Sequence, residues 1–288
     1  MSTAAERVAI FDLDTAPALA CIQSLGRRGI AVDAYGHSSL AAARWSRYVT
    51  RYQHCPETAD RQIFLPWLQQ ELQAGRICRI APTSDLMAWY CSELRERFAP
   101  AVQRSIPPLS AVVACLDKGL FAQNCDALGM PTPRSFTPES LEQALDAAKI
   151  MGYPLMLKPR THIGVGTGPR GGIVRDEAAL RQWFQPYSIR PGYEDVLAQH
   201  PGFRWPLLQE FMPSARSAVY HVTGFRDPDN GICLSLSSLR TQSFPPDVGI
   251  SAAQEVHEQP DLRAQTHKLV DRLLPAGIFE LELLEREG

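Results

Sequence analysis

Residues 154–175 constrain the fold of this chain most strongly, because they place a glycine-rich segment between two short apolar segments. The first apolar segment, residues 154–158, ends in a lysine, and the second spans residues 172–175. Both have the composition of strands, so we predict a strand–loop–strand hairpin. Its glycines, which let backbone amides approach a ligand without obstruction by a Cβ atom, are at positions 164, 166, 168, 171 and 172.

The hairpin has the chemistry of a phosphate-binding element. Lys158 places a compact positive charge directly before the loop. The loop is not a Walker A motif, because no Gly-Lys-Ser/Thr follows, and it is not a dinucleotide fingerprint, because a strand follows instead of a helix. We therefore predict that backbone amides and lysine bind phosphate here. The alternative is a mobile surface hairpin whose glycines only form turns.

The N-terminal part of the chain predicts a parallel sheet. Residues 8–11 form a short apolar segment, residues 16–25 have helical spacing, and residues 30–34 form a second apolar segment. This order is that of a βαβ unit. Polar loops such as residues 82–85 follow predicted strands, and ligands bind at this carboxyl edge of parallel sheets. We predict that residues 1–112 form the first domain.

The remainder predicts helices alternating with antiparallel strands. Helices are expected from residue 117, over 138–151 with Thr137 as N-cap, and over 262–274, and residues 186–206 are expected to form a loop. The last predicted strand, residues 278–284, alternates polar and apolar side chains. We therefore expect Glu280 and Glu282 on one face, and the opposite face to contain Phe279, Leu281 and Leu283.

Composition excludes several classes of protein. A length of 288 residues suggests two domains or three small ones, and 45% hydrophobic with 21% charged residues excludes a disordered chain. The net charge of -2 gives no general attraction to nucleic acid or membranes, and no apolar run reaches the length of a membrane helix. The N-terminus lacks the layout of a signal peptide. Seven cysteines at wide spacing, without a CxxC pair, favour a reducing cytoplasm over a disulfide framework.

The order of these features resembles the ATP-grasp superfamily, in particular its carbamoyl-phosphate-synthase-like and biotin-carboxylase-like carboxylate–amine ligases. The resemblance implies an α/β protein, α+β in its C-terminal part. A Rossmann-like N-terminal parallel sheet would precede an ATP-grasp domain with antiparallel sheets and a glycine-rich lid. The implied subdomains are residues 113–206, with the lid, and an incomplete C-terminal part, residues 207–288. The motifs that support it are Pro82-Thr-Ser-Asp85, Asp117-Lys118, Tyr153-Pro-Leu-Met-Leu-Lys158, the glycine-rich hairpin, Gln209-Glu-Phe-Met-Pro213 and Gly277-Ile-Phe-Glu-Leu-Glu282.

The resemblance also implies an ATP site. Lys118 and Lys158 would contact the phosphates, and the hairpin 164–172 would close over them as a lid. The implied ATP-binding residues in this region are Lys118, Lys158, Gly164, Gly166, Thr167, Gly168, Gly171 and Gly172.

Further roles follow from the same resemblance. Glu210, Phe211 and Met212 would line the adenine pocket, with the amide of Met212 as a partner of the ring. Arg240 would be the catalytic residue directed toward phosphate or an acyl phosphate. Glu282 would bind Mg²⁺, which usually takes one or two carboxylates together with nucleotide phosphates.

The implied function is an ATP-dependent ligase, with ATP and Mg²⁺ as cofactors, which activates a small carboxylate as an acyl phosphate for attack by an amine. The family's strand with the remaining metal ligands is not found after Glu282, so we expect slow turnover or none. A homodimer or a partner could then complete the C-terminal sheet. The alternative is a nucleotide-binding protein or enzyme fragment that does not catalyse.

A different alternative comes from residues 8–15, which resemble the nucleophile strand of haloacid-dehalogenase-type phosphatases. Asp12 would attack phosphorus and Asp14 would act as acid and base. The threonine lies one residue early, and no Asp-Asp pair exists elsewhere. The basic and aromatic residues 44–52 could bind nucleic acid, but a surface segment on the sheet edge explains them better. The seven histidines lack the spacing of a transition-metal site.

Overall fold

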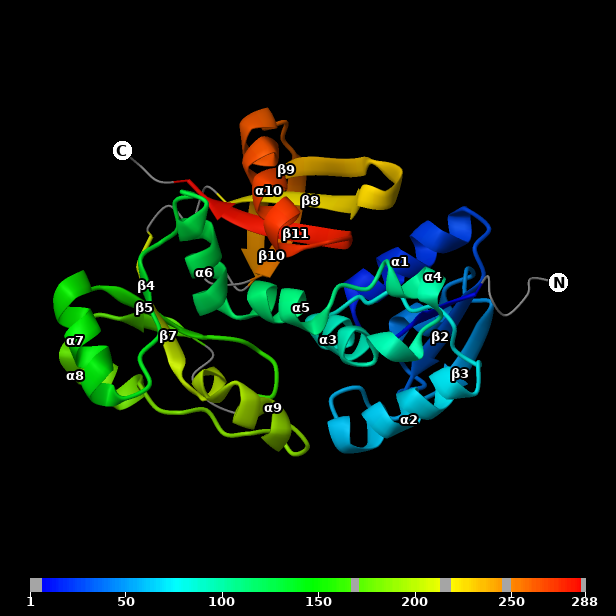
Figure 1. The fold of residues 1–288 in the computed structure, drawn as a ribbon, viewed down its shortest axis with the longest axis horizontal. Coiled ribbons are helices and arrows are strands. Elements are labelled where there is room, and N and C mark those ends of the chain that lie inside the picture. Colours follow the sequence, from blue (N-terminus) through cyan, green and yellow to red (C-terminus); the bar gives the residue numbers. More distant parts are fainter. Residues whose placement is uncertain (1–6, 167–170, 213–218, 245–249, 286–288) are drawn as a thin grey trace. The chain divides into compact units, whose positions relative to one another are not determined.

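The computed structural model describes residues 7–166, 171–212, 219–244 and 250–285 of the chain (Figure 1). It divides into two compact units. Unit 1 comprises Met1–Val112 and Ile189–Gln199, and unit 2 comprises Val113–Ser188 and His200–Gly288. None of the helices in the described ranges is long and apolar enough to span a membrane.

Unit 1 is built on a parallel sheet in the order β1-β2-β3. Helix α1 joins β1 to β2, and the hydroxyl of its N-cap Thr15 accepts a hydrogen bond from the amide of Ala18 at 3.3 Å. Ile22 of this helix is buried against Ile10 and Val32 of the sheet. The predicted βαβ unit is confirmed. The elements of unit 1 are β1 (Val8–Ile10), α1 (Ala16–Arg27), β2 (Val32–Gly36), η2 (Ala42–Trp45), β3 (Arg51–His54), α2 (Arg61–Gln73), α3 (Asp85–Glu93), η3 (Arg95–Arg97), α4 (Pro100–Gln103) and α9 (Glu194–Gln199), and α5 (Leu109–Leu116) crosses into unit 2.

The segment 189–199 belongs to unit 1 because it forms hydrogen bonds with residues of α2 and α3. The guanidinium of Arg61 donates to both carboxylate oxygens of Glu93 at 2.7 Å and to the carbonyl of Gly192 at 2.8 Å. The hydroxyls of Tyr90 and Tyr193 lie 2.8 Å apart, and both side chains are buried. The loop predicted over residues 186–206 is therefore wrong in part, because α9 and the 3-10 helix Pro201–Arg204 form within it.

The first sheet of unit 2 contains the predicted hairpin. Strands β5 and β6 pair antiparallel, with Leu155 opposite Val174, and the sheet order is β4-β7-β5-β6. Helices α7 and α8 cover one face, where Leu157, Leu180 and Ala148 join the buried core. The elements are β4 (Ser135–Phe136), α7 (Leu141–Met151), β5 (Leu155–Pro159), β6 (Gly172–Val174), α8 (Glu177–Trp183) and β7 (Pro206–Glu210).

The second sheet of unit 2 is antiparallel, in the order β10-β9-β8-β11 (Figure 1). Helix α10 packs on one face of it, where Val270 and Leu274 contact Val222 and Phe279. The opposite face is polar around His221 and Glu282, whereas Phe225, Leu236 and Ile278 are exposed toward its other end. The remaining elements of unit 2 are α6 (Lys118–Ala127), β8 (Val219–Asp227), η6 (Pro228–Asn230), β9 (Ile232–Phe244), β10 (Ile250–Val256), α10 (Pro260–Leu273) and β11 (Gly277–Leu284).

Candidate functional site

The alternation predicted for the last strand is confirmed. Phe279 and Leu283 of β11 pack into the core beneath α10, and Leu281 packs beside them against α6 and α10. Glu280 and Glu282 are exposed on the other face. Two carboxylates two residues apart therefore lie on the side of the sheet away from α10.

Basic side chains from neighbouring strands share this polar face. Nη1 of Arg240 on β9 lies 3.9 Å from Oε1 of Glu282, and the Arg240 side chain is 11% exposed. Nδ1 of His221 on β8 lies 3.2 Å from Oε1 of Glu280, and its Nε2 lies 3.0 Å from Oγ of Ser251. The hydrogen bond from His221 holds the pKa of Glu280 below its usual value.

Lys158 of β5 adds a second cation near Glu282. Its Nζ donates to Oε1 of Gln209 on β7 at 2.9 Å. Burial lowers the pKa of the Lys158 ammonium below its usual value, and the negative charge of Glu282 opposes this shift. The structure thus brings Lys158, Arg240 and Glu282 together from three strands of two sheets. Two cations beside an exposed carboxylate form a suitable site for phosphate and a hard divalent cation.

The magnesium assignment fits the donor chemistry of this face. The Glu282 side chain is 56% exposed, so its oxygens can reach a cation whose other ligands are phosphate and water. Within the described residues, no group of three or more His, Cys, Asp and Glu side chains is arranged to hold a metal by itself. Glu282 could therefore hold Mg²⁺ only together with ligands from a bound nucleotide or from residues outside these ranges.

Lys118 is the first residue of α6, and the structure adds Arg160, which the sequence analysis missed, as a partner of the preceding Asp117. Asp117 is buried, and its Oδ1 accepts from Nε of Arg160 at 2.7 Å and from the amide of Gly119 at 2.9 Å. The amide of Lys118 donates to the carbonyl of Arg160 at 3.1 Å. Arg160 lies two residues after Lys158, so this pair ties the start of α6 to the end of β5. The role of Lys118 in phosphate binding stays a prediction.

The glycines of the hairpin have distinct structural reasons. Gly164 and Gly171 have positive φ angles, 71° and 112°, which disfavour other residues. The amide of Gly166 donates to the carbonyl of Ser188 at 2.8 Å. Gly172 pairs with Leu157, and a Cβ atom there would lie 2.5 Å from Trp183. The other two predicted residues of the loop, Thr167 and Gly168, lie outside the described residues.

We expect Gly171→Ala to destabilise the protein more than Gly231→Ala. Both glycines have positive φ, which costs an alanine about 1–2 kcal/mol. A Cβ atom at Gly171 would also lie 3.0 Å from the carbonyl oxygen of Leu157. Apart from the residues adjacent in sequence, no described atom would lie within 4 Å of a Cβ atom at Gly231. Urea denaturation of both variants measures the difference. Equal loss of unfolding free energy would show that the contact with Leu157 has no cost.

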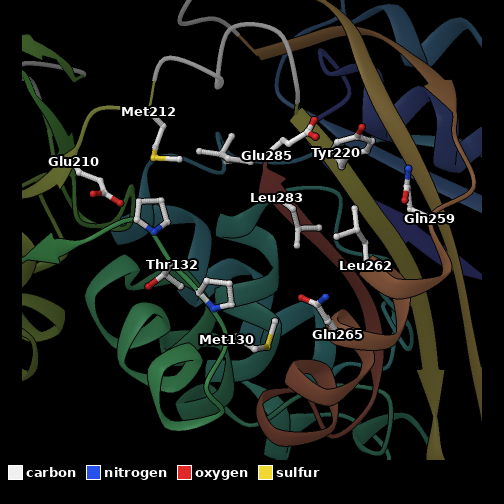
Figure 2. Close-up of a pocket in the computed structure, with 13 residues that line it drawn as sticks. Met130, Thr132, Glu210, Met212, Tyr220, Gln259, Leu262, Gln265, Leu283 and Glu285 are labelled. Carbon is white, nitrogen blue, oxygen red and sulfur yellow. The ribbon is translucent and has the colours of Figure 1, made fainter. Parts of the chain in front are cut away.

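Of the three residues predicted to line an adenine pocket, two line the same cavity and one does not. Glu210 and Met212 line a cavity of about 370 Å³, and Phe211 is not among its lining residues (Figure 2). The carboxylate of Glu210 accepts from the amide of Arg134 at 3.0 Å and from its Nε at 3.3 Å. Glu210 pairs with Leu155, so its side chain lies on the α7 side of the sheet, opposite to Lys158. Arg134 was missed because it follows a proline-rich connector with no recognisable motif.

Asp12, the nucleophile of the phosphatase alternative, has a structural role. Its two carboxylate oxygens accept from the hydroxyls of Thr58 and Ser84, each at 2.6 Å. These bonds connect three loops of unit 1 and engage both oxygens. The similar proteins described below favour the ATP-grasp fold over that of the phosphatases.

Residues 117–190 match a family model described as "Carbamoyl-phosphate synthase L chain, ATP binding domain". The carbamoyl phosphate synthase large chain of Vibrio vulnificus is 29% identical over 161 residues, which are 51% of this chain and 14% of that protein. The large chain of Thermus thermophilus is 33% identical over 88 residues, 29% of this chain and 8% of that protein. The chain thus spans a small part of the length of these relatives.

Solved structures resemble the chain over nearly its whole length. Carboxyaminoimidazole ribonucleotide synthase from Aspergillus clavatus, complexed with ATP, superposes with a TM-score of 0.66 at 13% identity, covering 99% of this chain and 67% of that one. L-amino acid ligase from Bacillus licheniformis gives 0.63 at 14% identity, covering 99% and 65%. The resemblance inferred from the motifs is therefore confirmed: the chain has the ATP-grasp fold, and its residues 117–190 match the ATP-binding domain of the carbamoyl-phosphate synthase large-chain family.

Proposed function

We propose that the chain binds ATP and uses it to activate a small carboxylate for attack by an amine. The observation that supports this most is that Glu282 lies 3.9 Å from Arg240 and interacts electrostatically with Lys158, which precedes the glycine-rich loop on the other sheet. The relatives named above, a carbamoyl phosphate synthase large chain and an L-amino acid ligase, favour the same reaction class.

The reaction has two bond-forming steps. A carboxylate oxygen attacks the γ-phosphorus of ATP, the bond from that phosphorus to the β,γ-bridging oxygen breaks, and ADP leaves. The amine then attacks the acyl carbon, the bond from that carbon to the oxygen that carries the phosphoryl group breaks, inorganic phosphate leaves with that oxygen, and the amine loses a proton. Positioning and charge neutralisation provide most of the rate enhancement in phosphoryl transfer.

The residues have the following proposed roles. Lys158 and Lys118 neutralise phosphate charge, and the hairpin amides of 164–172 bind phosphate oxygens. Arg240 stabilises the charge that develops on the transferred phosphoryl group. Glu282 would hold Mg²⁺, which when bound neutralises phosphate oxygens. The adenine lies beside the main chain of residues 210–212.

The organisation of the chain adds three proposals. We propose functional divisions at 1–112, 113–206 and 207–288, and a cytoplasmic location because all seven cysteines are free. Among the described strands, β11 has a neighbour on one side only, so another strand, from this chain or a partner, can pair with its open edge.

Replacing Lys158 by alanine should weaken binding of Mg-ATP roughly tenfold to a hundredfold. A charge-assisted hydrogen bond contributes about 1.5–3 kcal/mol, and 1.4 kcal/mol corresponds to a factor of ten. Isothermal titration calorimetry measures the affinity. The control is Lys149→Ala, because Lys149 is an exposed lysine of α7 paired with Asp146. Equal ATP affinity of the two folded variants would remove Lys158 from the site.

A further inference from the structure

The cavity of about 370 Å³ lies at the C-terminal end of β11, mainly on the α10 face of the second sheet, and Leu284 lines it from the opposite face. Leu283 of β11 and Tyr220 of β8 line it, and these two residues are direct partners in the strand pairing, so their side chains share a face. Leu262 of α10 lines it as well and packs with Leu283 in the core beneath α10. Glu282, one residue before Leu283, therefore points to the other side. We call this space the rear cavity.

In the first sheet, too, the residue that lines the rear cavity and the phosphate-binding lysine lie on opposite faces. Glu210 lines the rear cavity, and its carboxylate binds Arg134, whose Nη2 also donates to the carbonyl of Met151 at the end of α7. Lys158 and its partner Gln209 lie on the opposite face of the same sheet. Phosphates bound at Lys158, Arg240 and Glu282 would therefore lie on the other side of the two sheets from Glu210 and Leu283.

The lining of the rear cavity selects for an apolar ligand without negative charge. Its walls include Met130, Met212 and Leu262 (Figure 2) as well as Pro131, and none of the lining residues within the described ranges is a lysine or an arginine. Its polar groups are the hydroxyls of Thr132 and Tyr220, the amides of Gln259 and Gln265, and two carboxylates. Arg134 binds both oxygens of Glu210, so the exposed carboxylate of Glu285 is placed to attract a cation.

The rear cavity also touches the connections between the parts of unit 2. Residues 130–133 connect α6 to β4, residues 210–212 leave the first sheet toward β8, and Glu285 follows Leu284, the last residue of β11. Figure 2 shows side chains from these segments turned toward a common space. The volume falls within the range of small-molecule sites, about 300–1,000 Å³.

We propose that the rear cavity is a second ligand site, which binds a small aromatic amine at the same time as ATP. The ring packs between the methionines, prolines and leucines, and the ammonium group pairs with Glu285. Flexible methionine side chains let such a wall adapt to the ring. The ligand contacts residues 130–133 and 210–212, the two connections of the first sheet. Its binding can therefore change the affinity for ATP without competing for the ATP site.

Tryptamine is the probe, with indole-3-acetate as an anionic control of similar size. We expect saturable binding of tryptamine by calorimetry or by tryptamine-observed NMR, and at least tenfold weaker binding of indole-3-acetate. Leu262→Trp should fill the cavity and weaken tryptamine binding at least tenfold, and Glu285→Gln should weaken it several-fold. Lys158→Ala should leave tryptamine binding unchanged.

Several results would overturn the proposal. These are absence of saturable tryptamine binding by the wild type, equal binding of indole-3-acetate, or unchanged binding in Leu262→Trp. Competitive displacement of tryptamine by Mg-ATP would show instead that the cavity holds the nucleotide base. Urea denaturation of Leu262→Trp checks its fold, and Leu262→Met, which keeps the volume similar, should retain binding if the tryptophan acts by filling the space.

Discussion

Arg61→Ala should lower the free energy of unfolding by about 3–5 kcal/mol, the cost of removing one partner from a buried ion pair. The Arg61 side chain is 5% exposed and makes a two-point ion pair with Glu93. It also donates to the carbonyl of Gly192, and its guanidinium lies 5.3 Å from the centre of the Tyr193 ring. The substitution therefore leaves the Glu93 carboxylate without its arginine partner. It also removes the hydrogen bond that holds the segment 189–199 in unit 1.

The matched control is Arg76→Ala in the same unit. Arg76 makes a similar two-point pair with Glu71 at 2.7 and 2.8 Å, but its side chain is 58% exposed. Exposed pairs contribute about 0–1 kcal/mol, so this variant should remain close to the wild type. Chemical denaturation of both variants gives the comparison. A loss at Arg61 no larger than that at Arg76 would contradict the anchoring of residues 189–199 by Arg61.

Arg240→Ala should lower the rate of ATP-dependent turnover by about 10²–10³, the usual effect of removing one group that stabilises charge in the transition state. Arg240 is nearly buried on the polar face and lies beside Glu282. Its charge is fixed in place before the reaction, so its loss affects kcat more than the affinity for ATP.

The control for Arg240 is Arg181→Ala, because Arg181 is an exposed arginine that pairs with Glu177 on its own helix. Steady-state kinetics with Mg-ATP should show unchanged kcat for Arg181→Ala. A raised KM with unchanged kcat for Arg240→Ala would assign Arg240 to ground-state binding and remove the catalytic role proposed for it.

The sequence predicted the features that depend on local patterns. Period-two alternation placed Glu280 and Glu282 opposite Phe279 and Leu283, because side chains alternate strictly along a strand. The two apolar segments on either side of the glycine-rich loop predicted the two strands of the hairpin. The order of motifs along the chain pointed to the ATP-grasp fold.

The features missed depend on contacts between distant residues. Arg61 binds the carbonyl of Gly192, 131 positions away, and Asp117 binds Arg160, 43 positions away. Neither pair can be recognised from the local sequence, because the residues around a buried, paired arginine or aspartate look the same as those around an exposed one. The side of the sheet on which Glu210 lies was missed for a related reason: it depends on the pairing of β7 with β5 and on Arg134, 76 positions earlier.

Carboxylate-dependent release of ADP, with hydroxylamine present to trap the acyl phosphate, tests the proposed function most directly. The intact chain is incubated with Mg-ATP and each member of a panel of amino acids, with Lys158→Ala as the inactive control. We predict that at least one carboxylate raises ADP release above the carboxylate-free rate and that the matching hydroxamate accumulates in proportion. Binding of ATP with ADP release that no carboxylate increases, and with no hydroxamate, would contradict carboxylate activation and favour a nucleotide-binding protein that does not catalyse.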